Sequence, residues 1–202
     1  MFGQQRGLHL FSAFGIDVFV SLWYLLLMAF IVFSPGFGGG AAGASAMVHG
    51  VLFAIAVTLS LLVHEYGHAL VSKYYKLSPS ILLHGFGGLC SHRPAESDRD
   101  DAIIVGAGPG AGILFGFVSL GVLLVVQSTA SPSGTTNLAM GFLMNLVWVN
   151  FVWSAVNLLL PLYPLDGGKL FHLLLRRVVT ESKAREITLK TSLAVGVAGG
   201  AI

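Results

Sequence analysis

The sequence predicts an all-α polytopic membrane protein, with about four to six transmembrane helices and a small membrane-associated β element. Composition is the first observation: of 202 residues, 55% are hydrophobic and only 10% are charged. The mean hydropathy is +0.83, which is typical of a membrane protein and not of a soluble domain. The second observation is that long apolar stretches alternate with short loops rich in glycine, proline or charge.

The first predicted span covers roughly Val20 to Phe33. An alternating stretch from Gly15 to Val20 precedes it and indicates a short strand. A loop of small residues, Gly38 to Ala46, follows the span. This beginning also resembles a secretory signal peptide, but the apolar stretch is long and Asp17 interrupts its start, which favours a retained span.

The second predicted span, about Met47 to Ser72, ends at tyrosines and lysines of the kind that anchor helices at the membrane interface. The next segment, Leu77 to His92, is too short and too broken by glycine and proline to cross as a helix. We expect a β-hairpin or a re-entrant element there. Irregular backbone at membrane depth is tolerated only where protein or a water-filled cavity surrounds it.

The third and fourth spans are predicted at about Ala102 to Gln127 and about Leu138 to Leu160, joined by an uncharged loop, Ser128 to Asn137. The charged segment before them, Arg93 to Asp101, predicts a solvated loop. The glycine run from Gly106 to Gly112 superficially resembles a dinucleotide-binding loop. No βαβ unit surrounds it, so we expect it to permit close helix packing instead.

Two prolines and two glycines between Pro161 and Gly168 cannot continue a regular helix. The basic segment Lys169 to Lys190 is predicted to be helical. The apolar tail from Thr191 to Ile202 would be about 18 Å long as a helix, too short for a hydrocarbon core of about 30 Å. We therefore expect residues 1–202 to form a single integral-membrane domain whose last span continues beyond Ile202.

Charge predicts the orientation. All eleven lysines and arginines lie at the N-terminus, between the second and third spans, or after the fourth. The positive-inside rule places these segments in the cytoplasm, giving four clear spans with both ends inside. A net charge of +2 without a basic patch argues against a nucleic-acid partner. The single cysteine, Cys90, excludes an intrachain disulfide and is predicted to be a small apolar filler.

The second span carries His64-Glu65-Tyr66-Gly67-His68. Residues four apart share one face of a helix, so both imidazoles can bind one metal ion, with Glu65 beside them. Placing an ionisable residue at the bilayer centre costs about 2.5 to 3.5 kcal/mol. Three such residues within the five positions from His64 to His68 therefore need a compensating partner. A divalent cation meets that need and favours a metal site over ordinary helix residues satisfied by their neighbours.

Asp166 is the predicted third ligand, because among the acidic residues only Glu65 and Asp166 sit in apolar sequence at the end of a span. A turn-forming Asp-Gly is the other interpretation of Asp166. Three histidines remain alternative third ligands: His84, His92 and His172. The motif lies close to the predicted cytoplasmic face, since His68 is about 7.5 Å along the helix from Lys73.

Two imidazoles and a carboxylate with an open fourth position are typical of a catalytic zinc site, with one zinc per chain. Zinc activates water and polarises a carbonyl, and Glu65 can move the proton as catalytic base. This chemistry predicts peptide-bond hydrolysis, and a site inside the membrane predicts a transmembrane segment as substrate. Strand-like pairing with Ser80 to Leu89 would satisfy its unwound backbone.

Together, the His64-Glu65-x-x-His68 motif and the later stretch from Asn157 through Leu165-Asp166-Gly167-Gly168 resemble the site-2 protease family of intramembrane zinc metalloproteases. The resemblance extends to the Gly87-Gly88 element. It implies that His64, His68 and Asp166 bind zinc, that Glu65 is the catalytic base, and that Asn157, Gly87 and Gly88 contact the substrate. The implied substrates are single-pass membrane proteins involved in signalling.

Three other functions fit parts of the sequence. A zinc or cation transporter would use Glu65 as a ligand and would need polar residues in the far half of the membrane, where His49 is almost alone. A catalytically inactive scaffold would keep the fold without the chemistry. A di-iron oxygenase would require more histidine motifs. In a prokaryote, the expected location is the inner or plasma membrane.

Overall fold

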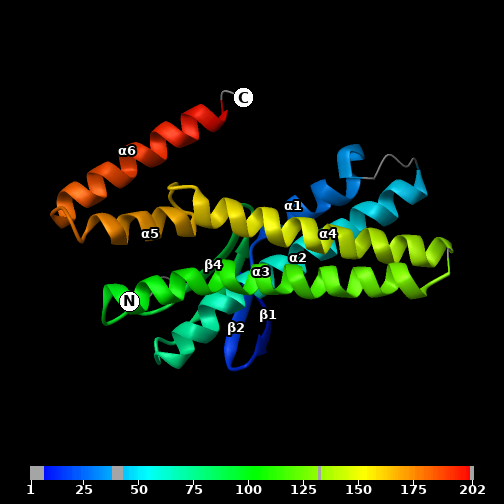
Figure 1. The fold of residues 1–202 in the computed structure, drawn as a ribbon, viewed down its shortest axis with the longest axis horizontal. Coiled ribbons are helices and arrows are strands. Elements are labelled where there is room, and N and C mark those ends of the chain that lie inside the picture. Colours follow the sequence, from blue (N-terminus) through cyan, green and yellow to red (C-terminus); the bar gives the residue numbers. More distant parts are fainter. Residues whose placement is uncertain (1–6, 38–42, 132, 201–202) are drawn as a thin grey trace.

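The computed structural model describes residues 7–37, 43–131 and 133–200. Three helices in this part of the chain are long and apolar enough to cross a membrane: α2 (Ala44–Tyr74), α3 (Asp98–Thr129) and α4 (Gly134–Leu159). They lie side by side (Figure 1), with the most extensive contacts between α3 and α4 and between α2 and α3. The predicted class, a polytopic helical membrane protein with a small β element, is confirmed, and the second to fourth predicted spans correspond to these helices.

The predicted span from Val20 to Phe33 is corrected. Val20 is the last residue of a strand, and Ser21 caps α1 (Leu22–Phe33) by accepting a hydrogen bond from the Tyr24 amide. Twelve residues make a helix of about 18 Å, shorter than a hydrocarbon core of about 30 Å. Within the described residues, three helices therefore meet the length for spanning, and α1 is a shorter apolar helix. Residues 38–42 of the predicted small-residue loop lie outside the described residues.

The charged segment from Arg93 to Asp101 is not entirely a loop. Ser97 accepts a hydrogen bond from the Asp100 amide and caps α3, which starts at Asp98. Acidic residues in this first turn suit the positive end of the helix dipole, and α3 is correspondingly longer than the apolar span. Apolar sequence indicates the membrane-embedded part of a helix, so the prediction missed the polar first turn of α3.

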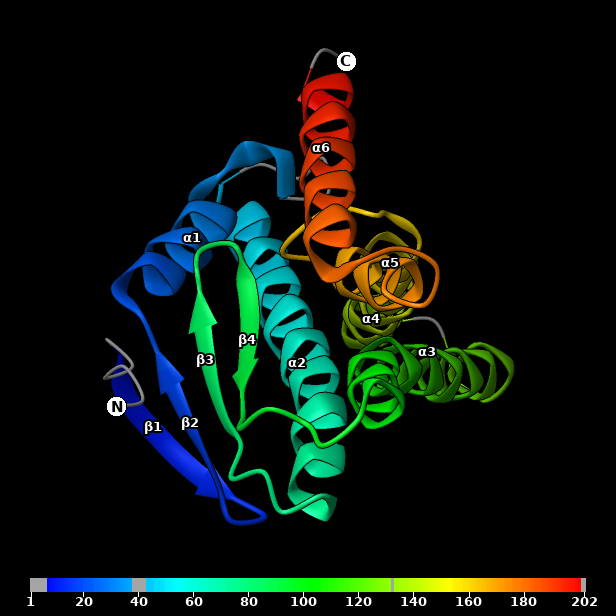
Figure 2. The same cartoon turned by 90° about the vertical axis from the view of Figure 1, so that its left-hand side faces the viewer.

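The chain breaks after α4 as predicted and resumes as α5 (Asp166–Leu175), followed by α6 (Glu181–Gly200). The basic segment thus forms two helices, and α6 continues into the apolar tail as one element. In Figures 1 and 2, α6 projects away from the helix bundle and packs mainly on α5. Residues 201–202 of the tail lie outside the described residues.

A four-stranded sheet lies beside α1 and α2 (Figure 2). Its strands are β1 (Leu8–Ala13), β2 (Ile16–Val20), β3 (Ser80–His84) and β4 (Gly87–Ser91), in that spatial order. β2 and β3 are parallel, and the other two pairs are antiparallel. The predicted strand before α1 and the predicted hairpin are both present. β1 was not predicted from the sequence.

The inward-facing side chains of β2 pack the sheet against the helices. Ile16, Val18 and Val20 are buried, whereas Asp17 is exposed. The buried side chains pack with Ile81 and Leu83 of β3 and with apolar residues of α1 and α2. This shared core holds the β3–β4 hairpin against the part of α2 that carries the histidine motif.

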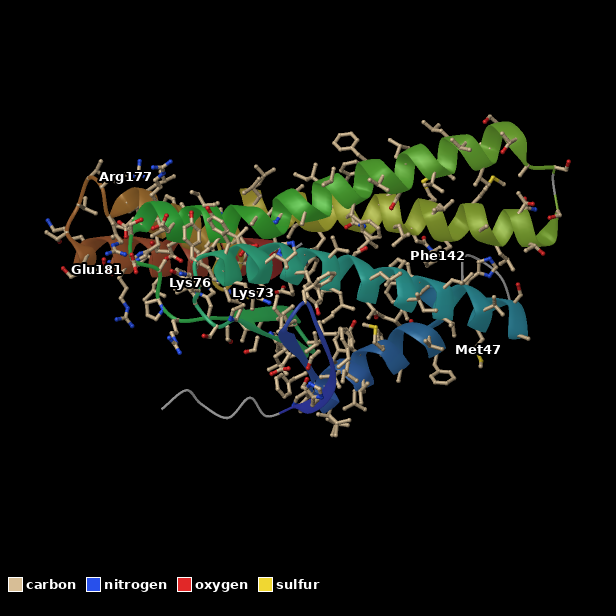
Figure 3. All side chains as sticks on the ribbon, turned by 90° about the horizontal axis from the view of Figure 1, so that it is seen from below. Met47, Lys73, Lys76, Phe142, Arg177 and Glu181 are labelled. Carbon is tan, nitrogen blue, oxygen red and sulfur yellow. The ribbon has the colours of Figure 1, made fainter. Side chains whose placement is uncertain are left out.

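The two ends of the bundle differ in charge. In Figure 3, Lys73, Lys76, Arg177 and Glu181 lie towards one end, and Met47 and Phe142 lie towards the other. The starts of α2 and α4 therefore share an end, which means that these two helices run in the same direction. Both deliver their C-terminal residues to the charged end of the molecule.

Close packing of α2 on α3 depends on Gly67, because a Cβ atom there would overlap the carbonyl oxygen of Ala107. We expect Gly67→Ala to destabilise the protein by about 1 to 3 kcal/mol, since the two backbones must separate. Gly110→Ala is the matched control on α3, where a Cβ atom meets open space. Thermal unfolding in detergent measures both variants. Equal midpoints for the two would contradict the predicted packing role.

Candidate metal centre

Three buried side chains from two helices meet at one point. His64 and His68 are one turn apart on α2, and Asp166 is the first residue of α5; their exposed fractions are 3%, 6% and 4%. Gly167 and Gly168 pack so closely on the backbone of residues 158–163 that side chains would not fit. The chain between α4 and α5 can therefore fold back and direct Asp166 towards α2.

The distances between the donor atoms suit a metal ion. His64 Nε2 lies 3.1 Å and His68 Nε2 lies 3.3 Å from the same atom, Asp166 Oδ2, and the two nitrogens are 3.2 Å apart. In a tetrahedral site with bonds of about 2.0 to 2.1 Å, neighbouring donors are separated by about 3.3 Å. Within the described residues, this is the group of three ligand-type side chains that could hold a metal.

The hydrogen bonding of His68 supports the same conclusion. Its Nδ1 lies 2.7 Å from the Ile104 carbonyl oxygen, which can only accept, so Nδ1 carries the proton. In the neutral imidazole, Nε2 then presents a lone pair to the Asp166 carboxylate, which also presents lone pairs. Acceptors at 3.3 Å repel one another unless a cation lies between them. The donor set therefore fits a divalent metal.

Glu65 is buried beside this group, with an exposed fraction of 5%. It lines a cavity of about 80 Å³ that His64, His68 and Asp166 also line. Gly88 of β4 lies against the Glu65 carboxylate, and a Cβ atom at Gly88 would come within 2.5 Å of Oε1. A carboxylate next to the ligands, but outside their cluster, is suitably placed to exchange a proton with a molecule in the cavity.

The other predicted site residues lie around the same cavity. Asn157 of α4 lines it, is 5% exposed, and donates a hydrogen bond from Nδ2 to the Trp153 carbonyl at 3.2 Å. Gly87 begins β4 with a φ of 127°, a conformation that favours glycine, and packs against the Trp153 ring. Gly88 is in the cavity wall. All seven predicted site residues thus lie in or next to one region.

The alternative third ligands lie outside the ligand cluster. His84 and His92 line the cavity but are not in the ligand cluster. His84 Nδ1 accepts a hydrogen bond from the Phe86 amide, and His172 lies 3.3 Å from Glu181. Of the candidates that the sequence left open, the structure brings Asp166 to the histidine pair.

Sequence reasoning missed three contributors. The Ile104 carbonyl orients His68, Gly108 lies so close to the His68 ring that a Cβ atom would overlap it, and Lys169 Nζ lies 3.9 Å from Asp166 Oδ1. The glycine run that contains Gly108 was the available signal, and its predicted packing role is confirmed at Gly108 and Gly112. The sequence shows Lys169 three residues after Asp166, but it does not show that the ammonium group points towards the Asp166 carboxylate.

Cys90 lines the cavity but does not belong to the ligand cluster. Burial raises the pKa of its thiol to about 12. This agrees with its predicted role as a small filler.

Two curated proteins are similar to this chain in sequence. The chain is 29% identical over 143 residues to the stage IV sporulation protein FB of Bacillus subtilis, covering 69% of this chain and 46% of that protein. It is 24% identical over 188 residues to a zinc metalloprotease of Methanocaldococcus jannaschii, covering 91% and 50%. The chain thus spans about half the length of these curated relatives. No family model matches it.

The fold is also found among solved structures. The site-2 protease from Methanocaldococcus jannaschii superimposes with a TM-score of 0.68 and 23% identity, over 95% of this chain and 82% of that one. These relatives and the three apolar helices identify a multi-pass integral membrane protein.

Metal analysis of the purified protein tests the ligand set. We expect about one divalent metal per chain in the wild type, and loss of it in His64→Ala and Asp166→Asn, because two remaining ligands bind weakly. His84→Ala is the matched control, since this histidine lines the cavity outside the cluster. Metal lost from His84→Ala but kept in Asp166→Asn would show that His84, and not Asp166, is the third ligand.

Gly108→Ala should lower metal affinity without removing a ligand, because the added methyl group displaces the His68 ring. A loss of about tenfold or more is expected, in line with the effect of disturbing the surroundings of a ligand. Gly106→Ala, on the same helix where a Cβ atom meets nothing within 4 Å, is the control. Chelator competition gives both affinities, and equal values would mean that the His68 ring tolerates the methyl group.

Proposed function

The chain resembles the site-2 protease family in sequence and in fold, and from that premise we propose that it is an intramembrane zinc endopeptidase. Residues 1–202 would form a single metalloprotease domain. One observation carries the proposal: His64, His68 and Asp166 direct ligand atoms to one point, with the Glu65 carboxylate in the same cavity. In this assignment these three residues bind one zinc ion and Glu65 is the catalytic base.

The donor set favours zinc with a catalytic role. Two imidazole nitrogens and one carboxylate oxygen are ligands that zinc prefers, and three protein ligands leave a fourth position open. When bound, zinc supplies a Lewis acid that polarises a carbonyl group and makes water acidic enough to attack near neutral pH. The cavity of about 80 Å³ around the cluster leaves space for water and a peptide group.

The residues of the chain perform the remaining steps. Glu65 accepts a proton from water as the water oxygen bonds to the peptide carbonyl carbon, and it returns that proton to the amide nitrogen as the C–N bond breaks. The Ile104 carbonyl keeps the His68 ring in the orientation that presents Nε2 to the site. Gly88 leaves the Glu65 carboxylate enough room beside β4.

The surroundings of the site favour an apolar, membrane-embedded substrate. An apolar groove of about 360 Å³ runs between α1, α2 and α4, and shares Phe86 and Trp153 with the metal cavity. It can accommodate side chains of a transmembrane segment of a single-pass, membrane-anchored protein. Signalling proteins are the substrate class that the family resemblance implies.

β4 can hold the cleaved segment in an extended form. It is the last strand of the sheet, and it carries Gly87 and Gly88 next to Glu65. An unwound helix needs partners for its backbone groups, which pairing with a strand edge supplies. Asn157 lies on the α4 side of the cavity and is proposed to bind the substrate backbone from there.

The distribution of basic residues indicates how the chain is oriented in the membrane. Lys73 and Lys76 at the end of α2, and Arg177 between α5 and α6, lie towards one end of the molecule (Figure 3). By the positive-inside rule we propose that this end is cytoplasmic and that the metal site lies near the cytoplasmic face. In a prokaryotic cell the membrane would be the inner or plasma membrane.

Glu65→Gln should abolish cleavage of a reconstituted single-pass membrane substrate while the metal remains bound. An amide cannot accept the proton, so a loss of at least about 100-fold is expected. Glu96→Gln makes the same chemical change at an exposed position and should leave cleavage unchanged. Product formation on gels measures both. Cleavage by Glu65→Gln at the wild-type rate would remove Glu65 from the mechanism.

A further inference from the structure

A polar cluster lies in the apolar bundle one helical turn deeper than the metal ligands. Asn150 of α4 is 1% exposed and Ser60 of α2 is 2% exposed. Asn150 Nδ2 donates hydrogen bonds of 2.8 Å to Ser60 Oγ and to the Leu146 carbonyl oxygen. Because that carbonyl can only accept, the amide orientation is determined. Asn150 Oδ1 is directed elsewhere and has no hydrogen-bond partner among the described residues.

Glycines of α3 show how the helices are aligned. A Cβ atom at Gly116 would contact Asn150, one at Gly112 would overlap Ser154, and one at Gly108 would overlap the His68 ring. These glycines are successive turns of α3. Ser154 therefore lies one turn from Asn150 and one turn short of His68.

The same alignment places Ser154 beside His64. Ser60 pairs with Asn150, and α2 and α4 run in the same direction. One turn onward from this pair, α2 presents His64 and α4 presents Ser154. Helical side chains also tilt towards the N-terminus, which brings the His64 ring towards the Ser60 level.

His64 has an unsatisfied polar atom at this level. Its Nε2 lies 3.1 Å from Asp166 Oδ2, and when Nε2 binds a metal, the neutral ring carries its proton on Nδ1. In the described structure, His64 Nδ1, Ser154 Oγ and Asn150 Oδ1 are all buried without a hydrogen-bond partner. Metal-bound histidines almost always donate the second ring N–H to an acceptor, and leaving a buried N–H unpaired is unfavourable.

We propose that Ser154 and Asn150 hold a buried water that accepts the Nδ1–H of His64, which makes both of them positioning residues of this ligand. The water accepts one hydrogen bond from His64 and donates one each to Asn150 Oδ1 and Ser154 Oγ. Three polar partners are typical of a buried water. The inference rests on the metal site proposed above and assigns His64 a support that parallels the Ile104 carbonyl at His68.

Zinc affinity of Ser154→Ala, measured with Zn²⁺ and a competing chelator, tests the inference. A loss of about 10- to 100-fold is expected, because the His64 ring loses the support that orients it. Ser119→Ala is the matched control: this serine is also buried in a spanning helix, but its hydroxyl donates to the Phe115 carbonyl of its own helix. Wild-type affinity in Ser154→Ala, or an equal loss in both variants, would overturn the inference.

Proton NMR of the Co²⁺-loaded protein supplies a signature that a merely structural role would not change. The wild type should show two hyperfine-shifted, slowly exchanging ring N–H signals, one from each histidine. In Ser154→Ala, the His64 signal should exchange faster while the His68 signal persists. Unchanged exchange of both signals would overturn the proposal. If the variant does not fold, the wild-type spectrum decides, since a single protected signal contradicts the bridge.

The two proposals fail separately. Zn²⁺ binding by the wild type that is lost in His64→Ala, together with wild-type affinity and N–H exchange in Ser154→Ala, would retain the metal site and overturn the water bridge. A wild type that binds no Zn²⁺ would overturn the metal site and the bridge with it.

Discussion

The structure depends on the cost of keeping ionisable side chains inside an apolar helix bundle. His64, Glu65 and His68 occupy one turn and a half of α2, and all are at most 6% exposed. Each would cost several kcal/mol in hydrocarbon without a partner. Asp166 Oδ2 lies 3.1 Å from His64 Nε2 and 3.3 Å from His68 Nε2, so ligand atoms from all three residues meet at one buried point. A cation at the shared point satisfies all three donors, so the bundle is organised around a position for a metal.

Small residues are required where this site meets the neighbouring elements. Gly88 faces Glu65, Gly108 faces His68, and Gly112 faces Ser154. At each position a methyl group would occupy the space of a functional side chain. The glycines that allow the elements to pack closely thus also leave space for the side chains of the site. Glycine is costly inside a helix, by about 1 kcal/mol relative to alanine, and α3 accepts that cost where it adjoins the ligands.

The sheet adds what a helix bundle lacks. Its core with α1 and α2 positions β4 beside the cavity, so backbone groups of a strand come near the metal ligands. A purely helical site would offer no such edge to an extended peptide. An apolar groove between α1, α2 and α4 shares Phe86 and Trp153 with the cavity. An extended backbone and apolar side chains can therefore be bound together.

Local sequence determined what depends on a single segment. Hydropathy identified α2, α3 and α4, the four-residue spacing placed His64 and His68 on one face, and prolines and glycines marked the break before α5. These signals are local because helix periodicity and transfer free energy act within one stretch of chain. Alternation found β2 in the same way, whereas β1, with five of its six residues exposed, carried no such pattern.

Tertiary structure decided what depends on contacts between segments. It selected Asp166 from four candidate ligands, although Asp166 is 102 residues from His64 in the chain. It also revealed the Ile104 carbonyl at His68, the level shared by His64 and Ser154, and the short α1. A backbone carbonyl has no residue signature, and the alignment of two helices is set by the packing of glycines on a third. The sequence alone therefore determined which helix carries the chemistry, and the crossing of the helices decided which atoms meet there.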